Sequence, residues 1–247
     1  MQFFKIFILL LFIVSCTISQ PTNQQNDNTA LYLVSEYNLQ ISEPSGLTYD
    51  GQFLWTVSDN TGSIYKLDTL GTVIKELNIN AQDPEGIAYD YNTNTLWIVE
   101  EATSNVKNIS LTGDIISWHH LDFVEQGNSG LEGICIKQNN NFCLLKEKNP
   151  GYFYLLSSDF NLIKSTKLDF ANDYSGIFPH TNNCYWIVSD QSKKLFLWNN
   201  SSDTVIKKFS LPFPKAEGIV FINKKNIIYI ISDLEHKLYK YKLVENF

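Results

Sequence analysis

The side chains best suited to chemistry in this sequence are acids that recur at two positions of a repeat. Three glutamates stand directly before a glycine: Glu85, Glu132 and Glu217. Five further acids end the apolar run that follows each repeat glycine: Asp59, Glu101, Glu147, Asp190 and Asp233. Carboxylates that crowd together raise one another's pKa unless a cation or donated hydrogen bonds offset the charge. Calcium takes about six to eight oxygen ligands, carboxylates among them, so these eight residues are candidate calcium ligands.

The repeat that must position these acids begins at a glycine followed by Leu or Ile. It occurs five times, at Gly46, Gly86, Gly133, Gly176 and Gly218. Each glycine is followed by an apolar run ending on an acid and then by a third apolar run, and in four copies a fourth run follows turn residues. Periods of this length, filled with short strands and turns, are typical of propeller blades. The glycines themselves are explained by a positive φ or by close backbone approach.

The last copy lacks its fourth run, but residues Leu31 to Ile41, upstream of the first glycine, have the character of the missing strand. The sequence therefore predicts an all-β fold. It is a five-bladed β-propeller with four antiparallel strands per blade, closed by the N-terminal strand, in a single domain over residues 31–247. Closed radial repetition leaves only short, protected strand edges.

In a propeller, the link into the innermost strand and the link out of the second strand open on the same face. Both sets of acids are therefore expected to meet at one mouth of the central channel. Ser45 and Ser175 replace glutamate in two blades, each with an acid two residues earlier, Glu43 and Asp173. An alternative for the five second-strand acids is that they only accept backbone N–H bonds from the following turn.

The N-terminus predicts the compartment. Lys5 is followed by an uncharged apolar run from Ile6 to Val14, too short for a transmembrane helix and typical of a signal peptide. The run ends in Ile13-Val14-Ser15-Cys16, which resembles a bacterial lipobox. We expect a signal peptide over residues 1–15, a lipidated Cys16 with a polar tether to residue 30, and a lipid anchor in the cell envelope outside the cytoplasm. The alternative is a secretory signal with a chance cysteine.

The charge and residue composition argue against some classes of binding partner. The formal net charge is −7 and there is no arginine, which argues against nucleic acid and against an anion receptor. Cys135, Cys143 and Cys184 are odd in number without CxxC spacing, so we expect buried thiols rather than a disulfide framework. We expect a monomer.

Few residues outside the acids offer catalytic chemistry. No P-loop, zinc-protease helix, nucleophile elbow or dinucleotide fingerprint is present. His119 and His120 fall in an outer strand and His180 at the far end of an innermost one. Only His236 follows an acid onto the acidic face, where it is a candidate general base beside Asp233. Lys146 and Lys148 flank Glu147 and are expected to balance its charge.

Three of the repeats carry a family resemblance: Pro84-Glu85-Gly86-Ile87-Ala88-Tyr89-Asp90, Leu131-Glu132-Gly133-Ile134 and Ala216-Glu217-Gly218-Ile219. With their acid-terminated strands, they resemble the SdiA-regulated (YjiK-like) family of bacterial propellers over residues 31–247. More distantly, they resemble propellers described as having esterase-like activity of phytase. The resemblance implies an envelope-exposed propeller, is consistent with calcium, and carries over no catalytic residues. Ser45 and Ser175 depart from the Glu-Gly form.

Two functional classes follow. The first is an envelope binding or scaffolding module that uses an acidic, calcium-binding face to hold a small molecule or an envelope protein. The second is a metal-dependent hydrolase, a phosphoesterase or lactonase, in which the cation polarises oxygen and activates water. The sequence favours the first, because His236 is the one candidate base.

Overall fold

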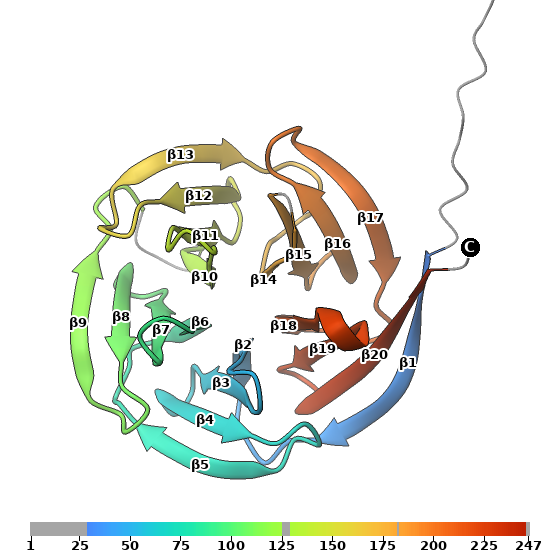
Figure 1. The fold of residues 1–247 in the computed structure, drawn as a ribbon, viewed down its shortest axis with the longest axis horizontal. Coiled ribbons are helices and arrows are strands. Elements are labelled where there is room, and N and C mark those ends of the chain that lie inside the picture. Colours follow the sequence, from blue (N-terminus) through green and yellow to red (C-terminus); the bar gives the residue numbers. More distant parts are fainter. Residues whose placement is uncertain (1–28, 125–128, 182, 246–247) are drawn as a thin grey trace, which may run out of the picture.

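The computed structural model describes residues 29–124, 129–181 and 183–245. These residues form five four-stranded antiparallel sheets arranged radially around a central axis (Figure 1). They contain no α-helix and one 3-10 turn, η1 (Asn223–Lys225). No helix within these ranges is long and apolar enough to cross a membrane. The predicted all-β propeller of five blades is confirmed.

The strands fall into four concentric positions. The innermost are β2 (Pro44–Tyr49), β6 (Pro84–Asp90), β10 (Leu131–Ile136), β14 (Gly176–Pro179) and β18 (Ala216–Ile222). The second are β3 (Leu54–Ser58), β7 (Thr95–Glu100), β11 (Phe142–Lys146), β15 (Cys184–Ser189) and β19 (Ile227–Ser232). The third are β4 (Ser63–Leu67), β8 (Asn105–Ile109), β12 (Tyr152–Leu156), β16 (Lys194–Asn199) and β20 (Lys237–Glu245). The outermost are β5 (Val73–Asn78), β9 (Ile115–His120), β13 (Leu162–Lys167), β17 (Thr204–Ser210) and β1 (Thr29–Asn38). Blades 1 to 5 are numbered here by the order of their innermost strands.

The ring is closed by the N-terminal strand, as predicted. β1 pairs antiparallel with β20, with Leu31 opposite Leu243 and Tyr37 opposite Leu238, so blade 5 is built from both ends of the chain. The strand ends at Asn38 rather than at the predicted Ile41. Leu39 and Ile41 are nevertheless buried, which explains why the apolar pattern continues past the end of the strand.

Burial follows radial position. Second strands are buried almost throughout, as β15 shows from end to end, because a blade packs against each of their faces. Outermost strands alternate between exposed and half-buried residues, as in β9 and β17. Each of the five hydrophobic clusters fills the space between two neighbouring blades. The core is therefore divided into five interblade layers.

The five repeat glycines, named here the ring glycines, mark where neighbouring innermost strands come closest. None has a positive φ. A Cβ on Gly46 would lie 2.6 Å from the carbonyl oxygen of Glu85, and one on Gly218 would lie 2.5 Å from the backbone nitrogen of Leu47. Close backbone approach, and not a left-handed turn, is thus the reason for glycine at these two positions.

The cysteines agree with the prediction. Cys135, Cys143 and Cys184 are buried free thiols, and Cys135 stands opposite Cys143 across the β10–β11 ladder. The predicted signal peptide and Cys16 lie outside the described residues.

Candidate functional site

A cavity of about 200 Å³ opens where the innermost strands begin, and it is named here the acidic cavity. Ten carboxylate side chains line it together with two lysines and two serines. All eight sequence-predicted acids are among them: Asp59, Glu85, Glu101, Glu132, Glu147, Asp190, Glu217 and Asp233. The remaining two carboxylates are Glu43 and Asp173. The two repeat positions therefore meet at one channel mouth, and metal binding by these residues stays a prediction.

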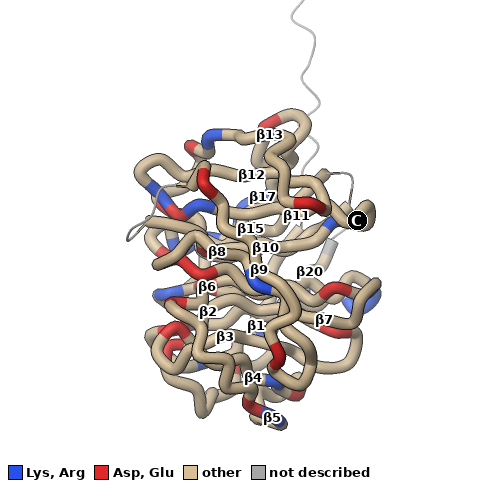
Figure 2. The backbone as a smooth tube through the Cα atoms, turned by 90° about the vertical axis from the view of Figure 1, so that its left-hand side faces the viewer, with Lys and Arg blue, Asp and Glu red and all other residues tan. Residues whose placement is uncertain are grey.

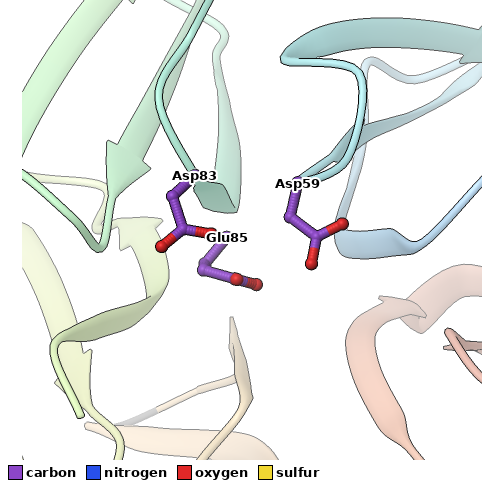
Figure 3. Close-up of side chains that lie close together, drawn as sticks. All are labelled: Asp59, Asp83 and Glu85. Carbon is purple, nitrogen blue, oxygen red and sulfur yellow. The ribbon is translucent and has the colours of Figure 1, made fainter. Parts of the chain in front are cut away.

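The first group of converging carboxylates spans blades 1 and 2. Asp59 follows β3, whereas Asp83 and Glu85 stand at the start of β6, and one oxygen of each lies within 4.8 Å of the others. The three side chains turn toward a common space (Figure 3). Asp59 Oδ1 is buried without a hydrogen-bond partner among the described residues. A buried, unsatisfied carboxylate oxygen is costly, so this group is suited to an external cation.

A second group spans blades 2 and 3. Glu101 follows β7, Glu132 begins β10 and Glu147 follows β11, and these oxygens also lie within 4.8 Å of one another. The side chain of Glu132 is nine-tenths buried, since its exposure is 9%. Within the part of the chain that the structure describes, it receives no hydrogen bond and forms no ion pair. Its charge is therefore offset only by the longer-range attraction of Lys148, whose own pKa Glu132 helps to raise.

The serines of the ring are hydrogen-bond donors to the next blade. Ser45 Oγ lies 2.6 Å from Glu85 Oε2 and 2.9 Å from the Glu85 carbonyl oxygen. Ser175 likewise hydrogen-bonds to Glu217 and lowers its pKa. Serine in place of glutamate before two of the ring glycines thus supplies a hydrogen-bond donor to Glu85 and to Glu217. Glu132, the third glutamate that precedes a ring glycine, has no such donor.

Two lysines offset part of the acidic charge. Lys148 pairs with Glu147, and Lys215 Nζ lies 3.3 Å from Glu217 Oε1. The expectation that Lys148 balances Glu147 is confirmed. Lys146, in contrast, is buried and donates to the carbonyl oxygens of Lys148 at 2.7 Å and Pro150 at 3.3 Å, so it fixes a turn instead.

Burial is the main cause of the shifted pKa values in the acidic cavity. It raises the pKa of Glu85 and of Glu132 well above the usual range, and neighbouring carboxylates raise both further. Burial raises the pKa of Glu217 to about 7 against the lowering effect of Lys215, and burial with Glu43 raises that of Asp59 to about 6. These shifts all have the same cause, namely ionised oxygens removed from water without enough counter-charge.

Backbone donors satisfy three of the acids. Glu101 Oε1 accepts the Gly130 N–H at 2.8 Å, and Asp190 Oδ1 accepts the Lys215 N–H at 2.7 Å. Each of these bonds ties one blade to the loop that enters the next. Asp173 is fully buried and accepts from the Gln191 N–H and from Ser189. The backbone-acceptor alternative for the second-strand acids therefore holds in part for Glu101 and Asp190, although their donors lie in the loop entering the next blade and not in the following turn.

Sequence reasoning missed Asp83 and Lys215. Both stand two residues before a ring glutamate, the position at which Glu43 and Asp173 had been noted in the serine blades. Comparing that position across all five copies would have found them. Glu43, Asp83 and Lys215 also share a left-handed backbone conformation, with φ of 44°, 55° and 51°.

His236 lies in the turn between β19 and β20 but is not among the residues lining the acidic cavity. Its Nδ1 is 2.9 Å from the Ile41 carbonyl oxygen, so Nδ1 must donate a proton there. This bond links blade 5 to the segment that enters blade 1. The geometry gives His236 a role in ring closure.

The cavity offers oxygen ligands, because its described lining contains carboxylates and hydroxyls but no Cys or His. Such a set suits a hard cation such as Ca²⁺ or Mg²⁺ better than Zn²⁺ or Cu²⁺. Figure 2 shows acidic residues in turns at the strand ends. Fold and site together define the class: a five-bladed β-propeller with an acidic, oxygen-lined central cavity.

The family follows from a sequence comparison. The family model described as SdiA-regulated matches residues 36–242, and the chain belongs to that family. The resemblance noted from the repeats is thereby confirmed. No curated protein matches the sequence.

Solved structures share the fold. Glutaminyl cyclase from Myxococcus xanthus is similar with a TM-score of 0.71 and 13% identity, over 88% of this chain and 97% of that one. Virginiamycin B lyase from Staphylococcus aureus has a TM-score of 0.53 and 18% identity, over 85% of this chain and 70% of that one. A streptogramin B lyase structure is similar with a TM-score of 0.52 and 20% identity, over 87% of this chain and 73% of that one. At these identities the likeness concerns the fold alone.

Proposed function

We propose that the acidic cavity binds a divalent cation, calcium first among the candidates, and that the protein is a binding or scaffolding module of the cell envelope. The cation would offset the excess of ten lining carboxylates over two lysines. Once bound, it would also present open coordination positions to an oxygen-bearing ligand, either a small molecule or a segment of an envelope protein.

The observation that carries this proposal is the carboxylate of Glu132. It is 9% exposed, its oxygen lies within 4.8 Å of oxygens of Glu101 and Glu147, and no described protein group donates to it. Burying an unpaired charge is strongly unfavourable. A bound cation removes that cost by neutralising several carboxylates at once.

The proposed ligands are the two carboxylate groups, Asp59 with Asp83 and Glu85, and Glu101 with Glu132 and Glu147. Glu217 contributes less, because Lys215 and Ser175 already compensate its charge. Asp190 and Asp233 lie on the same side of the cavity as Lys215. Burial raises the pKa of Asp233, and the charge of Lys215 opposes that rise. The cation is therefore expected on the side of blades 1 to 3.

A cation-dependent hydrolase using the same cavity has weaker support. Such an enzyme needs a base to activate water or a substrate hydroxyl within hydrogen-bond reach. His236 lies outside the cavity lining and its Nδ1 is engaged by the Ile41 carbonyl. The binding module is for this reason the preferred function.

The experiment is a thermal melt of the chain lacking residues 1–16, in calcium and in chelator. A ligand that binds only the folded state at about 100 times its dissociation constant adds about 2.7 kcal/mol, or roughly 5–10 °C in a domain of this size. Glu132→Gln should abolish most of that shift. In chelator the variant should be at least as stable as the parent, because a buried charge has been removed.

Asp122→Asn is the matched control. It also removes one negative charge, but the Asp122 side chain is 96% exposed and lies outside the cavity. It should keep the full calcium shift. A melting temperature indifferent to calcium, magnesium and chelator would overturn the proposal, as would an unchanged shift in Glu132→Gln.

A further inference from the structure

A second, larger cavity lies at the other end of the innermost strands. Its volume is about 790 Å³, within the range of about 300–1,000 Å³ that is usual for small-molecule sites. It is lined by the ends of β2, β6, β10 and β14 and by the turns that follow the last three. We name it the opposite cavity, because the acidic cavity is built from the beginnings of these strands.

Tyrosine rings held in place by their own hydroxyl groups form one wall of the opposite cavity. The Tyr49 hydroxyl donates to the Gly51 carbonyl at 2.6 Å, and that of Tyr91 donates to the Tyr49 carbonyl at 2.5 Å. The Tyr89 hydroxyl bonds to Asn94. Tyr89 and Tyr91 pack edge to face with centroids 4.8 Å apart. Since the hydroxyls are committed, these rings offer the cavity preorganised apolar surface.

Uncharged polar groups line another part of the cavity. Asn92, Gln138, Asn139 and Asn183 border the cavity, and side-chain amides carry both donors and acceptors. Asn92 Nδ2 already donates to Asn140 Oδ1 and Asn183 Nδ2 to Ser201 Oγ. Asp90 and Lys137 are the only Asp, Glu or Lys residues in its described lining. Lys137 Nζ is already bonded to Asn183 Oδ1 at 2.7 Å, and Asp90 Oδ1 accepts the Asn92 N–H at 2.9 Å. Apart from His180, the lining therefore carries one positive and one negative charge, both with partners.

We propose that the opposite cavity binds a short neutral glycan. Sugar rings have apolar C–H faces that pack on aromatic rings and rims of hydroxyl groups that pair with amides, which matches a wall of tyrosines beside asparagines and a glutamine. A phosphorylated or carboxylated ligand would meet a single engaged lysine in a chain without arginine. A purely apolar ligand would cover these exposed amides without giving them hydrogen bonds in place of water.

This site is independent of the proposed cation. Tyr89 lies four residues after Glu85 along β6, a rise of roughly 13 Å. The ring glycines bring the innermost strands together between the two ends. The two proposals can therefore fail separately.

The test uses the chain lacking residues 1–16 and three neutral trisaccharides, chitotriose, cellotriose and maltotriose. Saturation-transfer NMR and calorimetry should detect at least one of them with a dissociation constant of about 1 mM or tighter. Binding should be the same in calcium and in chelator, and Glu132→Gln should not change it. Absence of binding by all three up to about 10 mM overturns the proposal.

Tyr91 provides the decisive variants, because it is 64% exposed and lies in a turn, where substitution leaves the core intact. Tyr91→Ala should weaken binding roughly tenfold through loss of ring contact, whereas Tyr91→Phe, which keeps the ring and loses only the hydroxyl bond that positions it, should weaken binding less. Tyr32→Ala on β1, where Tyr32 is 53% exposed, is the matched control and should bind normally. Equal loss in Tyr32→Ala, or none in Tyr91→Ala, would place the glycan elsewhere and overturn the assignment.

Discussion

The five residues that precede the ring glycines do not contribute equally to the acidic cavity. Ser45 donates to Glu85 of the next blade, and Ser175 to Glu217, which also has Lys215. Glu132 follows the blade that carries Glu85 at this position, which has no hydroxyl to donate, so Glu132 has no donor of its own. A repeat that looks regular in sequence thus produces one carboxylate without a hydrogen-bond or ion-pair partner among the described residues.

For single residues, the sequence predicted where the acids lie better than it predicted which groups they bond to. All eight predicted acids line one cavity, because the topology brings both repeat positions to the same mouth. Which acid is satisfied depends on the neighbouring blade, some 40 residues away, as with the bond from Ser45 to Glu85. Lys146 and Lys148 show the same limit, since both flank Glu147 and only Lys148 pairs with it.

The raised carboxyl pKa values predict how the cation-free protein responds to pH. The pKa of Glu217 is raised from 4.5 to about 7 and that of Asp59 from 3.8 to about 6. Between the unfolded and folded values the native state binds more protons than the unfolded state, so stability falls as pH rises. In chelator, the melting temperature should therefore decline from about pH 4 to about pH 7.

Asp59→Asn should flatten the lower part of this decline, because the group can no longer lose a proton, and Asp122→Asn should not. Calcium should reverse the loss at the upper end by binding the ionised form. Melts across a pH series, with and without calcium, measure both effects. A melting temperature in chelator that rises over the whole interval would show that these carboxyls are not destabilised when ionised.

The sequence predicted the location of the strands well, because burial sets the apolar pattern, but it predicted the residues at which strands end less well. The apolar pattern of two outermost runs continues to Phe123 and Phe170, whereas the strands end at His120 and Lys167. In each case a buried leucine follows, Leu121 and Leu168, which continues the apolar pattern beyond the last ladder bond. Burial and strand pairing are distinct, and sequence periodicity reports the first.

The ring glycines give a test at the level of strand packing. A Cβ on Gly218 would lie 2.5 Å from the backbone nitrogen of Leu47 and 2.7 Å from the backbone carbon of Gly46, atoms that cannot move without shifting β2. Around Gly133 the nearest atoms are methyl groups of Ile177 and Leu145 at 3.0 and 3.3 Å. Gly218→Ala should destabilise the protein near the upper end of roughly 1–3 kcal/mol, and Gly133→Ala near the lower end.

Urea unfolding of the two variants and the parent measures the difference. Because both substitutions occur at the same repeat position, intrinsic strand propensity cancels between them. Equal losses would mean that side-chain crowding, and not backbone approach across the blade 5 to blade 1 junction, explains the glycines.

For the whole molecule, the sequence was sufficient to predict the architecture and one of its two cavities. The sequence contains five copies of the repeat, one of which lacks its fourth strand, and an additional strand upstream of the first copy. This pattern predicted that the N-terminal strand closes the ring, and β1 pairs with β20 as expected. The opposite cavity was not predicted. Tyr49 and Tyr89 stand three residues after a ring glycine, but the other three copies have no tyrosine there, and Tyr91 and the amides lie in turns of unequal length.

The position of β1 bears on how the propeller would be held at a membrane. β1 is the outermost strand of blade 5, and Thr29 pairs with Glu245 at the rim of the disc (Figure 1). The strands of this blade alternate in direction, so Thr29 lies toward the end that carries the opposite cavity. Attachment through the rim leaves the mouths of both cavities unobstructed by the point of attachment.

The last prediction concerns the proposed anchor. Twelve residues, 17–28, separate Cys16 from Thr29, a reach of roughly 40 Å when extended. Lipidation with two or more chains gives stable membrane attachment. In bacterial cells, the unaltered chain should therefore fractionate with membranes, and Cys16→Ser should appear in the soluble envelope or secreted fraction with an unchanged melting temperature. Mass spectrometry that found an unmodified Cys16, or a Cys16→Ser protein that stayed membrane-bound, would refute the anchor while leaving the propeller and its two proposed sites untouched.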